Sequence, residues 1–164
     1  RLTVITFSKE IDQYLPAGKD PRHMRNLQEV LYRQETEFQE ADYERLYAFV
    51  SRRISHRSLL VLFTNFESQT AMRRQLPYLQ RLAKQHLLLV VFFENTELSE
   101  LLDSRPRTTE DIYIKAVGEQ FALDKKLIVK DLERHGIQAI LTPPAELTVN
   151  AINRYLEIKA GSMI

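Results

Sequence analysis

Four polar side chains follow directly after an apolar segment at residues 59–63, and their types and positions could bind a ligand. The segment, Leu-Leu-Val-Leu-Phe, has the length and composition of a buried strand in a parallel sheet. In open α/β sheets, ligands usually bind in the loops that follow the carboxyl ends of strands. We therefore expect a binding crevice lined by Thr64, Asn65, Glu67 and Ser68.

Polar residues at three other strand ends would face the same crevice. These residues are Ser8, Glu94 and Thr142, each at or just after the end of a predicted strand. Asp42, at the start of a predicted helix, could also point into it. The acidic segment around Asp42, residues 35–44, can equally be a solvated loop and helix start, because acidic residues are favoured at helix N-termini.

Several common catalytic and binding motifs are absent from the sequence. The four glycines are never close together, so a phosphate-binding loop or dinucleotide fingerprint is excluded, and no Gly-x-Ser-x-Gly nucleophile elbow occurs. The absence of cysteine excludes disulfides and thiol chemistry. The histidines lack the spacing of a zinc site, and we assign them structural roles: His23, His56, His86 and His135.

Composition indicates one globular domain over residues 1–164, with 44% hydrophobic residues. Lysine plus arginine (23) nearly balance aspartate plus glutamate (22), so no global field favours nucleic acid or an anionic membrane. The longest apolar run, residues 87–93, has the length of a strand, not of a membrane helix. The chain opens in strand-like residues without a methionine, so we interpret it as a C-terminal fragment of a longer protein.

Strands and helices alternate along the sequence. We expect strands at residues 2–7, 11–15, 59–63, 87–93 and 137–141, and helices at 21–33, after Asp42, at 68–85, 109–134 and 145–160. Asp20 is the expected N-cap of the first helix, and Gly136 the C-terminal cap of the helix at 109–134. Residues 96–107 are expected to be irregular apart from a short turn. The strand at 59–63 should be central and covered on both faces. This pattern predicts a mostly parallel, doubly wound α/β sheet.

A basic cluster precedes the expected central strand, at the amino end and so on the opposite rim from the crevice. It is either a solvated face or a contact for an acidic partner, and it consists of Arg52, Arg53, His56 and Arg57.

An ordered series of segments resembles a known bacterial family. The series comprises Val-Ile-Thr-Phe-Ser at 4–8, Ile-Asp-Gln-Tyr-Leu-Pro at 11–16, Glu-Ala-Asp-Tyr at 40–43, Arg-Ser-Leu-Leu-Val-Leu-Phe-Thr-Asn-Phe at 57–66 and Asn-Arg-Tyr-Leu-Glu-Ile-Lys at 153–159. It is similar to domain-of-unknown-function family 58, whose conserved region looks like a von Willebrand factor A domain. The resemblance implies a three-layer, Rossmann-like fold with helices on both faces of the sheet.

The resemblance also implies a function and a setting. Such domains usually act as protein-interaction or assembly modules, often in the cytoplasmic part of a membrane-anchored protein, and are frequently encoded beside MoxR-type AAA+ ATPases. Many A domains bind a divalent cation through Asp-x-Ser-x-Ser, a threonine and an aspartate in three loops at the carboxyl end of the sheet. Hard Mg²⁺ suits such oxygen ligands, and a partner carboxylate can complete its octahedron.

This chain departs from that metal-binding pattern. None of its aspartates has serine two residues later, so the first metal loop and its strand are missing from the sequence. Asn65 stands where the resemblance places an aspartate, which replaces a charged ligand by a neutral amide and should lower metal affinity. Asp42 could supply an oxygen in place of the second-loop threonine. We therefore expect a degenerate metal site and no bound cofactor.

The missing strand leaves a gap that must be filled. In an A domain it lies between the strands matching residues 2–7 and 59–63. We expect either that these two strands pair directly or that a strand of another chain fills the gap, for instance in a homodimer, because an open edge invites aggregation.

Besides a folded structural remnant that lacks its ligand loop, two classes of function are consistent with these observations. The first is a non-enzymatic interaction module whose crevice loops meet a protein partner. The alternative is a metal-dependent hydrolase using the carboxylates of Asp42, Glu67 and Glu94, which would lack a histidine or nucleophile motif in the same loops.

Overall fold

The computed structural model describes residues 2–18, 22–33 and 40–161. The chain divides into two compact units, Arg1–Ser55 and His56–Ile164, and each is described by itself. The single domain over residues 1–164 stays a prediction.

The first unit is a β-hairpin followed by two helices. Strands β1 (Val4–Phe7) and β2 (Ile11–Leu15) pair antiparallel, and helices α1 (His23–Tyr32) and α2 (Tyr43–Arg53) follow. Two edge-to-face ring contacts join the hairpin to α2, between Phe7 and Tyr43 and between Tyr14 and Phe49, with centroids 5.5 and 5.1 Å apart. Such pairs stabilise beyond the area that they bury.

The start of α1 differs in part from the sequence prediction. Arg22 occupies its N-cap position and its side chain makes no capping hydrogen bond. The predicted cap, Asp20, lies outside the described residues, as do residues 35–39 of the acidic segment.

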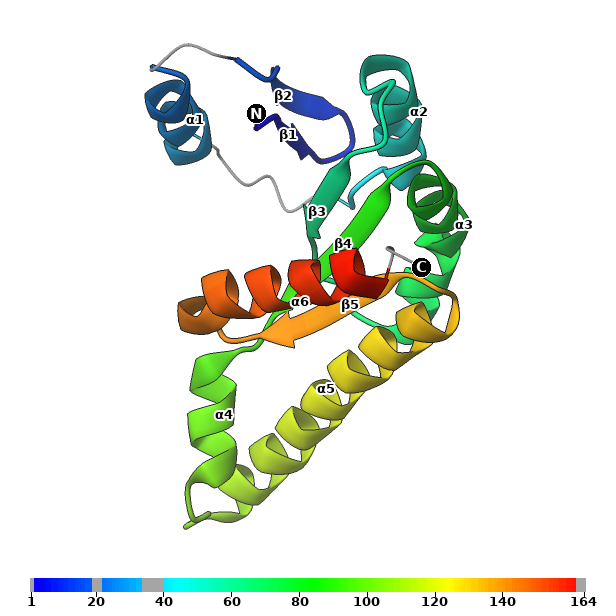
Figure 1. The fold of residues 1–164 in the computed structure, drawn as a ribbon. Coiled ribbons are helices and arrows are strands. Elements are labelled where there is room, and N and C mark those ends of the chain that lie inside the picture. Colours follow the sequence, from blue (N-terminus) through cyan, green and yellow to red (C-terminus); the bar gives the residue numbers. More distant parts are fainter. Residues whose placement is uncertain (1, 19–21, 34–39, 162–164) are drawn as a thin grey trace. The chain divides into compact units, whose positions relative to one another are not determined.

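The second unit contains a parallel sheet of three strands in the order β3-β4-β5 (Figure 1). The strands are β3 (Leu59–Phe63), β4 (Leu87–Phe93) and β5 (Gln138–Thr142). The helices are α3 (Gln69–Gln85), α4 (Thr96–Asp103), α5 (Thr109–Arg134) and α6 (Leu147–Gly161), with a 3₁₀ turn, η1 (Pro144–Glu146), before α6. The predicted α/β class with a parallel sheet is confirmed, whereas the von Willebrand factor A topology stays a prediction.

The direction of the two crossovers determines which face of the sheet each helix covers. Both β3-α3-β4 and β4-α5-β5 move one strand along the sheet in the same direction, and right-handed crossovers then place α3 and α5 on the same face. An ion pair between Arg73 of α3 and Asp131 of α5 agrees with this placement. On the other face, Asn150 of α6 bonds to Thr142 of β5. In Figure 1, α5 and α6 flank β5 on opposite sides.

The core lies around β4 and the helices over its even-numbered face. Five consecutive residues of β4, 88–92, are buried, and Met72, Leu79, Ile128 and Leu132 of α3 and α5 are fully enclosed. Gly136 ends α5 with a φ of 75°, a conformation that favours glycine, so its predicted capping role is confirmed.

Strand β3 contradicts its prediction. It was expected to be central and buried on both faces, but it is an edge strand, and Leu59, Val61 and Phe63 are 40%, 40% and 51% exposed. Its alternate residues, Leu60 and Leu62, are less exposed. An all-apolar sequence indicates that a strand is suited to burial, but it does not specify how many neighbours the fold supplies.

One further prediction is wrong in part. Residues 96–103 form helix α4, where Asn95 caps the helix by accepting a hydrogen bond from the Leu98 N–H at 3.0 Å, whereas residues 104–107 are irregular as expected. Within the first unit β1 pairs with β2 in a local antiparallel hairpin, which closes with little loss of chain entropy. Within the second unit β3 pairs with β4. The expectation that the gap is filled either by direct pairing or by a strand of another chain stays a prediction.

None of the helices in the described part of the chain is both long enough and apolar enough to cross a membrane.

Candidate functional site

Six of the predicted crevice residues lie in the loops at the carboxyl edge of the parallel sheet. We call them the strand-end loops: Thr64, Asn65, Glu67 and Ser68 after β3, Glu94 after β4, and Thr142 at the end of β5. The register of the sheet brings these segments side by side. The Thr64 N–H donates to the Val91 carbonyl at 3.2 Å, and the Glu94 N–H donates to the Thr142 carbonyl at 3.1 Å.

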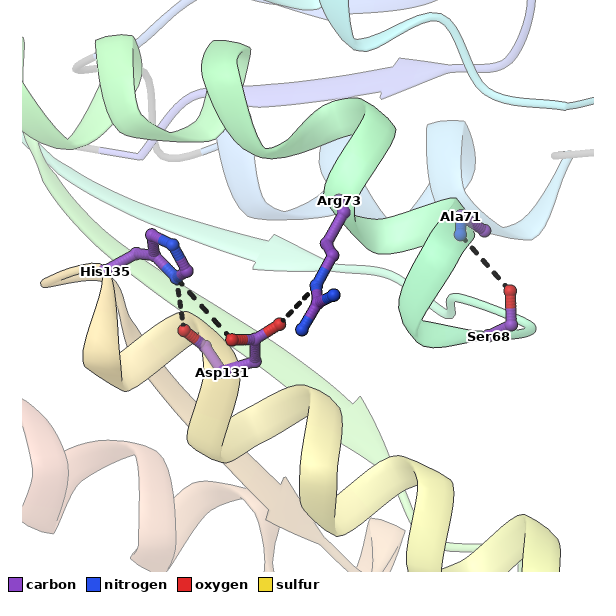
Figure 2. Close-up of polar contacts among 5 residues, drawn as sticks. All are labelled: Ser68, Ala71, Arg73, Asp131 and His135. Carbon is purple, nitrogen blue, oxygen red and sulfur yellow. Dashed lines mark hydrogen bonds and ion pairs between the residues drawn. The ribbon is translucent and has the colours of Figure 1, made fainter.

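Two helices begin at this edge, each with a side-chain cap. The Ser68 hydroxyl accepts a hydrogen bond from the Ala71 N–H at 3.2 Å at the start of α3 (Figure 2). Asn95 caps α4 in the same way. These caps satisfy backbone donors that are otherwise unpaired, so the Ser68 side chain has a structural role in addition to its position in the strand-end loops.

The ammonium group of Lys125 lies against the loop that follows β3. It donates hydrogen bonds to the Asn65 Oδ1 atom and, at 2.5 Å, to the Phe66 carbonyl oxygen. Burial lowers the pKa of Lys125, and the nearby negative charges of Glu67 and Asp124 oppose this shift. A positive charge from α5 is thus fixed beside the amide where the family resemblance places a metal-binding aspartate.

Thr142 is fully buried beneath the start of α6. Its hydroxyl accepts a hydrogen bond from the Asn150 amide at 2.8 Å and donates to the Pro143 carbonyl at 3.2 Å. With both functions of the hydroxyl occupied, Thr142 anchors α6 to β5, and a ligand in the loops would not reach it without displacing Asn150.

The other two predicted residues, Ser8 and Asp42, belong to the first unit and lie together there. The Asp42 N–H donates to the Ser8 carbonyl at 2.8 Å, and the Ser8 hydroxyl donates to Asp12 at 3.0 Å. The Asp42 carboxylate accepts from the Arg45 N–H at 2.9 Å and so caps α2, as the sequence predicted. Each residue therefore stabilises the hairpin or the helix of its own unit.

A buried carboxylate outside the strand-end loops joins α3 to α5. Asp131 is 6% exposed, and its Oδ2 atom lies 2.9 Å from Arg73 Nε (Figure 2). His135 Nδ1 donates to the Asp131 carbonyl at 2.7 Å and lies 3.8 Å from its carboxylate. The arrangement satisfies the Asp131 charge where the two helices pack, so we assign it a structural role.

The histidines occupy structural positions. His86 and His135 lie at the C-caps of α3 and α5. His86 is buried, its Nδ1 atom accepts a hydrogen bond from the Ser58 N–H at 3.4 Å, and burial lowers its pKa against the opposing hydrogen bond with the His56 backbone. His23 Nε2 lies 2.7 Å from the Leu2 carbonyl oxygen.

Two residues of the site, Lys125 and Asn150, were not predicted from the sequence. Lys125 belongs to a Lys-Lys pair within a long helix, a pattern typical of a solvated face, and its contact with Asn65 spans 60 residues of sequence. Asn150 lies eight residues after Thr142, in a helix with no polar periodicity that marks it. Neither contact has a local sequence signal, because each joins two different elements of the packed unit.

Within residues 2–18, 22–33 and 40–161, no three His, Cys, Asp or Glu side chains come together as a group that could hold a metal ion. Comparisons with models of known protein families and with curated proteins found no match. The resemblance to the bacterial family therefore stays a prediction based on the ordered segments.

Proposed function

We propose that this chain is a non-enzymatic protein-interaction module that contacts its partner through the strand-end loops. One observation carries the proposal: the Lys125 ammonium is held by Asn65 Oδ1 and the Phe66 carbonyl at the end of β3. In the A domains that the sequence resembles, this position is electropositive because of a metal ion. Here an internal cation supplies the positive charge, and a partner carboxylate is the complementary ligand.

The chemistry of this loop also argues against a strong divalent-cation site. The ligand at the expected aspartate position is a neutral amide, and its oxygen already accepts from Lys125. A divalent cation placed there would have to displace the ammonium or be repelled by it. The module that we propose is thus a metal-independent relative of an A domain.

Thermal unfolding with and without Mg²⁺ or Mn²⁺ tests the metal-independent module. A ligand that binds only the folded state, at 100 times its dissociation constant, raises the free energy of unfolding by about 2.7 kcal/mol. We expect no such increase at millimolar cation. A stabilisation of this size that disappears in Asn65→Ala would contradict the proposal and favour a metal site at this loop.

Replacement of Lys125 tests the role of the internal cation. Lys125→Met removes two hydrogen bonds from a charged donor, and we expect the free energy of unfolding to fall by about 1.5 kcal/mol. This is at the low end for such bonds, because the variant also removes the cost of taking the ammonium partly out of water. Lys126→Met is the matched control, since Lys126 is exposed and adjacent. Equal unfolding free energies for the two variants, from urea titrations, would show that the Lys125 contacts do not stabilise the loop.

The family resemblance suggests a MoxR-type AAA+ ATPase as the partner. Co-purification of the ATPase from the same host with the wild-type chain, but not with Lys125→Met, would support the proposal. Retention of equal amounts by both chains would place the contact elsewhere on the molecule, and binding of neither would remove this class of partner.

A further inference from the structure

Strand β3 has a free hydrogen-bonding edge. The Leu87 N–H donates to the Ser58 carbonyl and the Thr64 N–H donates to the Val91 carbonyl, so the even-numbered backbone groups of this segment face β4. Because successive residues of a strand alternate in direction, the N–H and C=O groups of Leu59, Val61 and Phe63 point away from the sheet. Among the described residues of the second unit, none of these outward groups has a hydrogen-bond partner.

The side chains of the same three residues form an exposed apolar surface. Val61 is 40% and Phe63 51% exposed, and Phe63 stacks on Phe93 of β4 with ring centroids 5.9 Å apart. Natural edge strands are usually protected by a charge, a proline or a bulge. Strand β3 contains none of these, and its register with β4 is regular throughout.

We propose that the free edge of β3 pairs antiparallel with β3 of a second copy of this chain, forming a closed twofold dimer with a continuous six-stranded sheet. In a register centred on Val61, each Val61 faces its counterpart and Leu59 of each copy faces Phe63 of the other. The outward N–H and C=O groups of all three residues are then satisfied, because they form the hydrogen-bonded pairs of the antiparallel ladder. This dimer goes beyond the proposed function and does not depend on it.

The residues that flank β3 make this register complementary in charge. Arg57 precedes the strand by two residues, and Glu67 follows it by four. In the antiparallel register centred on Val61, Arg57 of one copy lies opposite Asn65 of the other and within side-chain reach of its Glu67. Both Arg57 and Glu67 are exposed, and neither forms an ion pair within the described part of the chain. The twofold axis would create this contact twice.

These observations favour a second copy over an unrelated strand. The free edge has the same short apolar character in both directions around Val61, and its two flanks carry opposite charges, which is the pattern that an isologous interface requires. An unrelated strand could pair with the backbone groups of β3, but its own sequence would not place opposite charges beside both Arg57 and Glu67.

Sedimentation velocity of residues 1–164 over a range of about 1 to 200 μM tests the dimer. We expect a concentration-dependent monomer–dimer equilibrium, and Val61→Lys should weaken it by about 100-fold or more, because it places like charges opposite each other at the centre of the interface. Val61→Pro should also abolish the dimer while leaving the sheet intact, because the outward N–H of Val61 has no partner in the monomer. A chain that stays monomeric across the range would overturn the proposal.

One control variant and one charge reversal separate this edge from other apolar surfaces. Ile112→Lys changes a residue of α5 that is 58% exposed and should leave the dimer unchanged. Arg57→Glu and Glu67→Arg should each weaken the dimer, and the double variant should restore it. A dimer that survives Val61→Lys, or oligomers larger than a dimer, would show that the copies associate through another surface.

Discussion

Strands β3 and β4 have nearly the same composition and very different surroundings. Both are uninterrupted apolar segments, Leu-Leu-Val-Leu-Phe and Leu-Leu-Leu-Val-Val-Phe-Phe, and both predict a strand buried on two faces. In the structure, β4 has a strand on either side and five consecutive buried residues, whereas β3 has one neighbour and one exposed face. The comparison shows that apolar composition permits burial, and that the number of neighbouring elements decides it.

A charge placed in the middle of each strand gives the largest expected difference. Val90→Lys buries an unpaired ammonium at a position with no exposure. We expect the free energy of unfolding to fall by more than about 4 kcal/mol, which is most of the stability of a marginally stable domain. Val61→Lys should change the unfolding free energy by less than about 0.5 kcal/mol. Urea unfolding followed by circular dichroism, at a protein concentration where the chain is monomeric, measures both.

A strong destabilisation by Val61→Lys in the monomer would contradict the edge assignment of β3. It would mean that another part of the chain covers this strand in solution.

Substitution of two adjacent phenylalanines of β4 compares the packing on the covered and open faces of a single strand. Phe92 is 1% exposed and contacts the Phe66 ring with centroids 5.9 Å apart, whereas Phe93 is 44% exposed. We expect Phe92→Ala to cost about 3–5 kcal/mol, because it leaves a cavity beneath α3 and α5, and Phe93→Ala to cost about 1 kcal/mol. Similar losses for the two, from the midpoints of urea denaturation, would show that both faces are equally packed.

The sequence was sufficient for the local features of the fold. Asp42 caps α2, Gly136 ends α5, and the apolar segments form the expected parallel strands, because each depends on a few neighbouring residues. The edge position of β3 was not predictable, because apolar periodicity is the same for central and edge strands. Helix α4 was missed because its Asn95 cap and short length resemble a turn.

The candidate site was predicted where it depends on strand ends and missed where it depends on contacts between packed elements. Asn65, Glu67 and Ser68 follow β3 as expected. Lys125 of α5 donates a hydrogen bond in the same loop, and Asn150 of α6 donates one to the Thr142 hydroxyl. Both contacts form only when the helices pack on the sheet. Ser8 and Asp42 lie together in the first unit, joined by a backbone hydrogen bond.

The smallest expected effect concerns the amino ends of the two strands. His86 precedes β4 and accepts the N–H of Ser58, which precedes β3, and burial lowers the pKa of His86. The folded state therefore favours the neutral ring, and below an unfolded pKa of about 6.5 the unfolded chain gains the proton more readily than the folded chain. The unfolding free energy should fall, by at most about 1 kcal/mol, as the pH decreases from about 7 to about 5.5.

The pH dependence can be assigned to one residue by substitution. His86→Gln should flatten the curve between pH 5.5 and 7, whereas the exposed His56→Gln should leave it unchanged. The same slope in His86→Gln and in the native chain would assign the pH dependence to another group.

Helix α5 has 26 residues, but its contacts are unevenly distributed. Its last two turns carry Ile128, Asp131 and Leu132 into the core, whereas in the first half only Gly118 is buried, against Leu98 and Leu102 of α4. An added Cβ at Gly118 would lie 2.6 Å from Leu98, so the absence of a side chain allows this close approach. Amide exchange should therefore proceed in two tiers, with the α4–α5 hairpin opening at low free energy while the end of α5 stays protected until global unfolding.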